Sequence, residues 1–187
     1  MKRPQDKPHD GKTTSGAHPG VSPSRGGEDV GLLDQLAEFS VSAGEYASAL
    51  EYYEQILSIA ERARESSGLL AGVFLKMAHC RSQTGDYDAA VRLLDTALEN
   101  LPEDAPDLDR CEILNERAFA LIRLGEYGEA EHCVRAVTER ILDPAAAGEL
   151  ARAQSNYRVI AMRRGDWEAA HQSFEAALAG YRMVNDR

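Results

Sequence analysis

One fragment of the sequence carries residues that could hold a phosphate group. Gly11-Lys12-Thr13-Thr14 supplies the glycine, lysine and hydroxyl residues that end a phosphate-binding loop. Such a loop also needs a glycine five positions before the Gly-Lys pair, where this chain has Asp6. It further needs an apolar strand in front of it, which the sequence lacks. We therefore interpret the fragment as a chance match.

Two other fragments, His79-Cys80 and His132-Cys133, combine residue types that bind metals. Adjacent residues in a helix point about 100° apart, so neither pair converges easily on one ion. The two cysteines are expected to pack as small apolar side chains. Because no nucleophile–base arrangement, pocket carboxylate pair or glycine cradle emerges either, the sequence predicts a protein without a catalytic site, metal or cofactor.

Composition restricts the partners and the compartment. The 187 residues are enough for one domain with a sizeable core, and their net charge of −10 would repel a phosphate backbone, so we expect no nucleic acid partner. No apolar run reaches the ~18 residues that span a bilayer, so no membrane contact is expected. Three cysteines without paired spacing indicate no disulfide framework, and a cytoplasmic protein with reduced thiols is expected.

The N-terminal residues 1–29 differ from the rest of the chain. They contain four prolines, five glycines and almost no large apolar side chains. Such a segment cannot bury enough surface to offset its chain entropy, so a disordered tail is predicted. Helical spacing of apolar residues begins at Val30, and the folded domain is predicted to cover 30–187.

The folded domain is organised around a turn that recurs four times, at intervals of 40 or 41 residues. Each copy has a glycine for a left-handed turn, then an acid favoured at a helix N-terminus. An aromatic residue follows, expected to wedge against the preceding helix, and then an alanine where two helices cross. These structural positions are Gly44, Tyr46, Ala49, Gly85, Tyr87, Ala90, Gly125, Tyr127, Ala130, Gly165, Trp167 and Ala170.

An interval of this size is typical of solenoids, and the apolar residues on both sides of each turn keep helical spacing. The sequence therefore predicts an all-α solenoid of four helix-turn-helix repeats. Each repeat is apolar on one side and buries that side by stacking on its neighbours. The predicted repeats cover about 30–67, 69–107, 108–144 and 145–187.

At these positions the chain resembles the tetratricopeptide repeat family, which has a small residue seven positions before the turn glycine and a large apolar residue one position earlier. Ala37, Ala78 and Ala118 match the first of these positions, and Leu36, Met77 and Tyr157 match the second. Arg158 and Arg117 depart from them. Because a buried unpaired arginine is costly, Arg158 is expected either to pair with Glu175 or Asp166 or to mark a distorted terminal repeat.

The resemblance implies a right-handed superhelix that makes scaffolding or regulatory protein contacts. The interval exceeds the family's usual ~34 residues and is similar to the long-repeat subgroup of kinesin light chains, cell-polarity adaptors and bacterial regulators with a helical region like that of the maltose regulator. In the family, the first helix of each repeat lines a concave groove that receives a peptide. The corresponding positions here are Asp34, Glu38, Leu75, His79, Gln83, Asn115, Phe119, Ile122, Arg152, Ser155, Asn156 and Val159.

The groove positions predict a charge gradient. Asp34 and Glu38 stand where the chaperone-binding subgroup has a lysine and an asparagine, so the carboxylate clamp of that subgroup is not expected. The groove is acidic at this end and basic near Arg152 and Arg163. A peptide of opposite polarity is one hypothesis, and a merely solvated charged face is the other.

Two functions are compatible with these features. The first is a non-catalytic scaffold or adaptor that binds a protein or peptide segment. The alternative is the sensory region of a bacterial transcriptional or signalling regulator that binds a peptide or a small effector. At the C-terminus, Phe174, Leu178 and Tyr181 are expected to leave an apolar edge because no polar capping helix follows. We expect either that the chain is the N-terminal part of a longer regulator or that it self-associates through this edge.

Overall fold

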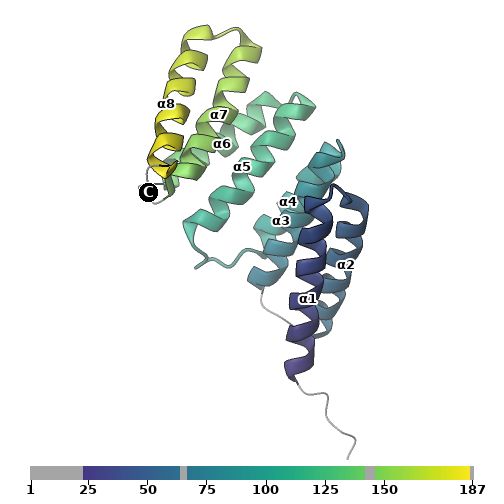
Figure 1. The fold of residues 1–187 in the computed structure, drawn as a ribbon. Coiled ribbons are helices and arrows are strands. Elements are labelled where there is room, and N and C mark those ends of the chain that lie inside the picture. Colours follow the sequence, from purple (N-terminus) through teal and green to yellow (C-terminus); the bar gives the residue numbers. More distant parts are fainter. Residues whose placement is uncertain (1–22, 64–66, 142–145, 186–187) are drawn as a thin grey trace, which may run out of the picture.

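The computed structural model describes residues 23–63, 67–141 and 146–185, and the regular secondary structure in these ranges is entirely helical. The prediction of an all-α fold is confirmed. The helices, drawn in Figure 1, are α1 (Pro23–Ser42), α2 (Tyr46–Ala63), α3 (Ser67–Gln83), α4 (Tyr87–Asn100), α5 (Asp107–Leu124), α6 (Tyr127–Arg140), α7 (Ala147–Arg164) and α8 (Trp167–Asn185).

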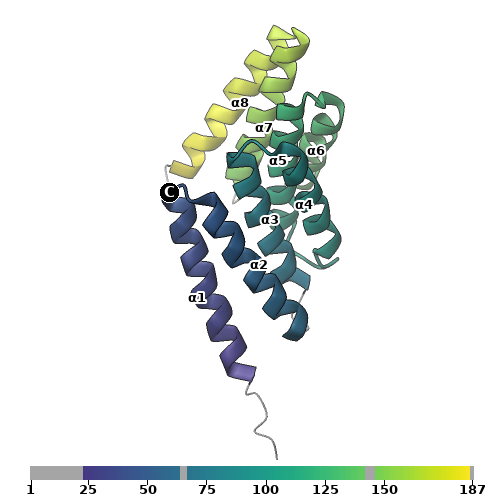
Figure 2. The same ribbon diagram turned by 90° about the vertical axis from the view of Figure 1, so that its right-hand side faces the viewer.

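The helices form four antiparallel pairs that stack into a superhelical solenoid. Within a pair, α1 packs on α2, α3 on α4, α5 on α6 and α7 on α8. Between pairs, the second helix of one repeat packs on the first helix of the next, and α5 also contacts α3 and α7. The helices α1 and α8 lie at opposite ends of the stack (Figure 1), and the turned view in Figure 2 shows the same succession of pairs.

The four turn glycines adopt the left-handed conformation that the sequence predicts. Their φ angles are +77° at Gly44, +83° at Gly85, +87° at Gly125 and +78° at Gly165. At each of them the chain reverses between two helices, and backbone amides close the end of the first helix. The amide of Gly85, for example, donates to the carbonyl of Ser82 at 3.1 Å. This is a C-terminal cap that only glycine adopts at low cost.

Two of the acids after these glycines cap the helices that follow. The carboxylate of Asp86 accepts the amide hydrogen of Ala89 at 3.2 Å, and the carboxylate of Asp166 accepts that of Ala169 at 3.0 Å. Each bond pairs an N–H group that has no partner inside its helix. The acid therefore contributes a specific hydrogen bond besides its favourable interaction with the helix dipole.

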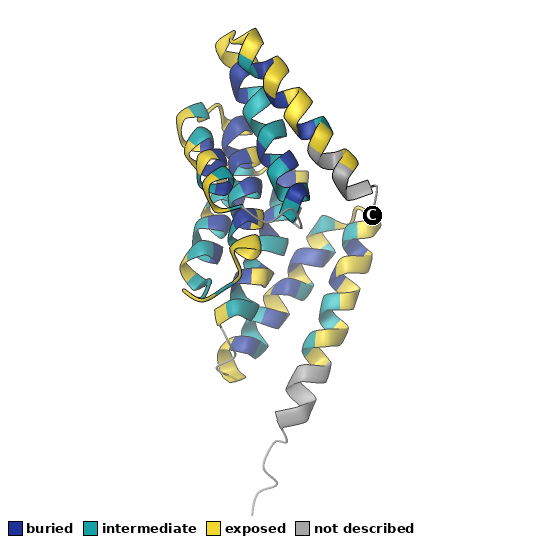
Figure 3. Ribbon diagram, turned by 90° about the vertical axis from the view of Figure 1, so that its left-hand side faces the viewer, coloured by how far each residue is buried: buried dark blue, intermediate teal, exposed yellow. Residues whose placement is uncertain are grey.

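The alanine after each turn occupies the crowded crossing point that was predicted. Ala49, Ala90 and Ala130 are fully buried and Ala170 is nearly so. Larger side chains from the second helices complete the core, and the buried positions lie where helices face one another (Figure 3). This packing is what lets four one-sidedly apolar pairs share a continuous core.

Helix α1 begins at Pro23, within the segment 1–29 that the sequence interpretation assigned to the tail. The sequence interpretation counted Pro23 as a sign of disorder. A proline is, however, well suited to the first helical position, where its fixed φ matches the helix and its missing N–H would have no partner. The rest of the predicted tail, residues 1–22, lies outside the described residues.

The aromatic residue of the second turn packs against a core cluster that includes Ala78 of the preceding helix, and it also contacts the following repeat. The ring of Tyr87 meets Phe119 of α5 edge-on, with 6.4 Å between ring centroids, and its hydroxyl accepts a 3.0 Å hydrogen bond from Arg123. The guanidinium of Arg123 also lies 5.2 Å above the Tyr87 ring. In this repeat the aromatic residue therefore fastens its own repeat to the next one.

The length and hydropathy of the helices decide whether any of them could cross a membrane. In the part of the chain that the structure describes, none of the helices combines the length and the apolar character needed to cross a bilayer.

Candidate functional site

Seven of the predicted groove residues line one cavity on the face formed by the first helices. This cavity has a volume of about 280 Å³ and is also lined by Glu116, which the sequence interpretation did not select. Its walls come from α3, α5 and α7. The seven predicted residues are His79, Gln83, Asn115, Phe119, Arg152, Ser155 and Asn156.

A second cavity continues this face toward α1. It has a volume of about 650 Å³ and shares His79 and Glu116 with the first. Glu38 from the predicted set lines it, together with Lys76 and Glu112. We call the two adjoining cavities the concave groove. Asp34 lines a smaller cavity of about 270 Å³ between α1, α2 and α3, which shares Lys76 with the groove.

Lys76 partly neutralises the end of the groove that was predicted to be acidic, with one positive charge against two carboxylates. Its ammonium group donates to the carboxylate of Asp34 at 2.6 and 2.9 Å and to that of Glu38 at 3.0 Å. Partial burial alone would lower the pKa of Lys76, but the hydrogen bonds to Asp34 and Glu38 outweigh this and raise it. The three residues thus tie α1 to α3 as one ionic cluster.

Arg152 is likewise paired, at the end that was predicted to be basic. Its guanidinium forms a close ion pair with Glu116 of α5 and a second, at 3.4 Å, with Glu149. Burial works against the charge on Arg152, but attraction to Glu149 and Glu116 raises its pKa overall. Each cluster joins one cation to two carboxylates, so Arg152 leaves no net positive charge at the end of the groove that was predicted to be basic.

Glu112 has a different environment from these paired acids. It lines the 650 Å³ cavity and forms no ion pair among the residues that the structure describes. Glu112 is exposed at the rim of the cavity. Loss of hydration raises its pKa and the negative charge of Glu149 raises it further, while the positive charge of Arg152 acts in the opposite direction. Glu112 is therefore an acid of the groove that has no ion-pair partner among the described residues, with Arg152 as the nearby cation that acts on it.

Asn115 joins the groove to the solenoid core. It is fully buried, and its amide nitrogen donates to the backbone carbonyl of Glu149 at 3.0 Å and to its carboxylate at 2.7 Å. The amide nitrogen of Asn156 in turn donates to the backbone carbonyl of Asn115 at 3.1 Å. The side-chain oxygen of Asn115 is a buried acceptor with no partner among the described residues. These bonds fix the relative position of α5 and α7 beneath the cavity.

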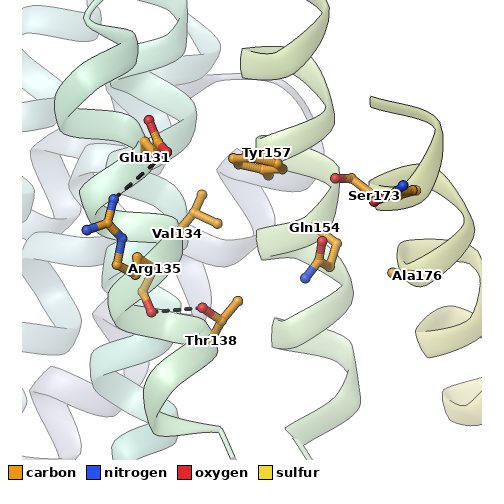
Figure 4. A pocket seen from close by; sticks show the side chains of 9 residues that line it. Glu131, Val134, Arg135, Thr138, Gln154, Tyr157, Ser173 and Ala176 are labelled. Atoms are coloured by element: carbon orange, nitrogen blue, oxygen red, sulfur yellow. Dashed lines mark hydrogen bonds and ion pairs between the residues drawn. The ribbon is translucent and has the colours of Figure 1, made fainter. Parts of the chain in front are cut away.

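A separate cavity of about 460 Å³ lies between α6, α7 and α8, on a different face of α7. Figure 4 shows Tyr157 and Gln154 of α7 between Val134 of α6 and Ser173 of α8. Glu131 and Arg135, four residues apart on α6, form a 3.9 Å ion pair at its rim. None of the predicted site residues lines this cavity.

The residues considered as metal ligands are not brought together. Cys80 and Cys133 are buried in the core, as is Cys111, whereas His79 lines the groove and His132 is exposed. In the described ranges, no three side chains of the usual metal-binding types are grouped. Burial raises the pKa of all three thiols, which keeps them in the neutral form that packs well.

Comparison with known families agrees with the repeat pattern. Residues 29–103 match the model of the tetratricopeptide repeat family. This stretch contains the first two turns, and the same left-handed glycine returns twice more in the remainder of the chain. Residues 29–103 thus match tetratricopeptide repeats, and the rest of the chain repeats the same turn.

Solved structures of tetratricopeptide type share its fold. The crystal structure of MamA has a TM-score of 0.62 and 14% identity, with 84% of this chain and 81% of that chain covered. The structure of BtubC from P. vanneervenii has a TM-score of 0.58 and 20% identity, covering 88% and 84%. The structure of a putative kinesin light chain from Podospora anserina has a TM-score of 0.58 and 23% identity, with 86% of this chain and 78% of that chain covered. No curated protein matched the sequence.

The two arginines that depart from the tetratricopeptide pattern each contact the helix paired with their own. Arg117 of α5, at a position that is usually apolar, donates to Asp95 of α4 at 2.7 Å and to Glu129 of α6 at 3.3 Å. Arg158 of α7 lies with its guanidinium 5.9 Å above the ring of Phe174. The expected ion pair of Arg158 with Glu175 or Asp166 is not formed in the described structure, because the arginine stacks on an aromatic ring instead.

Proposed function

We propose that the chain is a non-catalytic scaffold or adaptor whose concave groove binds a protein or peptide segment carrying a basic side chain opposite Glu112. A tetratricopeptide fold suggests a scaffold for protein–protein contacts in general. The observation that carries the finer proposal is the position of Glu112, an acid in the larger cavity that forms no ion pair with the described residues.

The charges of the groove favour a basic ligand over an acidic one. Lys76 and Arg152 already hold two acids each, so they have little capacity left for a carboxylate from a partner. A lysine or arginine from a bound segment would supply the ion-pair partner that Glu112 lacks among the described residues. A positive charge close to the Glu112 carboxylate stabilises its ionised form and lowers its pKa, which reverses the effect of lost hydration.

The groove also offers apolar surface next to this acid. Val41 and Leu75 line the same cavity as Glu112, and Phe119 lines the adjoining one with 40% of its surface exposed. A segment in which apolar and basic residues alternate would place apolar groups on these side chains and a cation on Glu112. Apolar burial would supply most of the affinity and the ion pair the selectivity.

Three peptides of equal length test this prediction: one alternates leucine with lysine, and in the others glutamate or glutamine replaces the lysine. We expect the lysine peptide to bind most tightly in a fluorescence anisotropy titration. Glu112→Gln should weaken its binding by on the order of 1 kcal/mol, because one partly exposed ion pair is lost. Affinity should also fall as the pH drops through the pKa of Glu112, which lies above its ordinary value of 4.5.

Glu139→Gln serves as the matched control, because Glu139 is an exposed acid on α6 away from the groove and its loss changes net charge equally. This variant should bind the lysine peptide as the unaltered chain does. Equal weakening by both variants would show that overall charge, rather than the groove, selects the peptide. Tighter binding of the glutamate peptide would contradict the proposal.

A further inference from the structure

The outer face of α1 exposes apolar residues at positions that are buried or half-buried in the other repeats. Leu32, Leu36 and Phe39 are 59%, 39% and 72% exposed. They stand twelve, eight and five residues before the turn glycine Gly44. The residues at the same distances before Gly85 are Val73, Met77 and Cys80, which are 4%, 7% and 0% exposed.

This difference follows from what each helix packs against. Helices α3, α5 and α7 each lie on the second helix of the preceding repeat, and this contact covers the equivalent positions. Helix α1 has α2 as its paired helix and no preceding repeat among the described residues. Its outer face therefore has the apolar composition of a repeat-to-repeat contact without the contact itself. Figure 3 shows exposed positions recurring along α1.

At the other end of the stack, the outer face of α8 exposes aromatic residues at positions that are more buried in the earlier repeats. Phe174, nine residues after its turn glycine, is 45% exposed, whereas its equivalents Tyr53, Leu94 and Val134 are at most 5% exposed. Trp167, two residues after the glycine, is 66% exposed, whereas Tyr46, Tyr87 and Tyr127 are half-buried. In the earlier repeats, the first helix of the following repeat covers these positions, as α5 covers Tyr87.

Phe174 is already positioned for such a contact. The guanidinium of Arg158 lies 5.9 Å from its ring centroid, so the ring is supported from its own repeat. An apolar side chain that packs against it would bury the ring without requiring it to move. The end of the fourth repeat thus presents an ordered aromatic surface.

We propose that chains of this protein stack end to end, with the outer face of α1 in one copy packed on the outer face of α8 in the next. The chain carries both halves of a contact that it makes three times internally, between α2 and α3, α4 and α5, and α6 and α7. A second copy therefore supplies a matching surface for each of the two exposed faces. This contact does not involve the concave groove.

The symmetry of this contact determines the kind of assembly. Because the two surfaces differ, the contact is heterologous, and each added copy leaves one α1 face and one α8 face open. Stacking that continues the superhelix does not close on itself after two copies, so linear assemblies of increasing length are expected. A symmetric dimer would instead join two α8 faces or two α1 faces.

Sedimentation velocity of the 187-residue chain over a wide concentration range tests the proposal. We expect a weight-average mass that rises with concentration above the monomer value of 20.5 kDa. Phe39→Glu should block the α1 face and Phe174→Glu the α8 face, so each variant alone should remain a monomer. An equimolar mixture should form a dimer and nothing larger, because one good α1 face and one good α8 face remain.

Leu108→Glu is the matched control, since Leu108 is a 49% exposed apolar residue at the start of α5, away from both end faces. This variant should assemble as the unaltered chain does, and circular dichroism should show that all variants keep their helices. A chain that stays monomeric up to high micromolar concentration overturns the proposal. So does assembly by Phe39→Glu alone, which would indicate a symmetric contact between α8 faces.

Discussion

The smallest unit that determines this fold is one backbone dihedral angle in each repeat. Gly85 joins α3 to α4 with a φ of +83°, and no atom outside its immediate neighbours lies within 4 Å of where a Cβ would stand. A side chain would therefore fit in space but not in conformation. Gly72, in the middle of α3, is equally open but has helical geometry. Both positions have room for a side chain, so a substitution at Gly85 tests backbone strain alone and one at Gly72 serves as its comparison.

Gly85→Ala should lower the free energy of unfolding by about 1–2 kcal/mol, because alanine is strained in the left-handed region. Gly72→Ala should instead raise it by about 0.5–1 kcal/mol, since glycine within a helix is less favourable than alanine. Urea denaturation followed by circular dichroism measures both. The same sign of change for the two variants would contradict this account of the turn.

At the scale of the helices, the position of α1 depends on the ion cluster of Lys76 with Asp34 and Glu38. Lys76→Met should make amides of α1 exchange faster with solvent and should lower the free energy of unfolding by up to about 1 kcal/mol, because these side chains are more than a third exposed and partly screened. The effect should diminish at high salt. Hydrogen exchange detected by mass spectrometry measures it.

The same cluster predicts a dependence on alkaline pH. The pKa of Lys76 is raised above 10.5 in the folded chain, so its contribution to stability is complete below that value and is lost as the pH rises through the raised pKa. Arg92→Met, on the exposed side of α4, is the control and should leave exchange in α1 unchanged. If the amides of α1 exchange equally fast in Lys76→Met and Arg92→Met, the ion cluster of Lys76 does not hold α1 in place.

The helices also show what the sequence could and could not predict. The turn glycines, the buried alanines and seven lining residues of one cavity follow from position within a repeat, because local spacing decides which face of a helix a residue occupies. The partners of Lys76, Arg117 and Arg152 do not follow in this way. Each ion pair of these residues between helices depends on side-chain conformation and on how neighbouring helices are displaced, and repeat spacing encodes neither.

For the whole molecule, stability is the sum of contacts between neighbouring repeats. The two end helices have one neighbouring helix each, apart from the ionic cluster on α1, while the middle repeats are covered on both sides. Of the apolar edge that the sequence predicted at the C-terminal end, Phe174 is 45% exposed and Leu178 is half-buried, and the side chain of Tyr181 lies outside the described residues. The sequence did not predict the matching face on α1, because Leu32, Leu36 and Phe39 have the helical spacing of ordinary core residues.

Trp167 gives the end of the stack an optical signal. It is the single tryptophan of the chain and is 66% exposed, so its fluorescence emission should be that of an indole in water. Burial against α1 of another copy should shift this emission to shorter wavelength as the concentration rises, and Phe39→Glu should abolish the shift. Acrylamide should quench the emission freely in the monomer and poorly in the stacked chain. The residue left uncovered at the last turn is thus a built-in probe of what covers it.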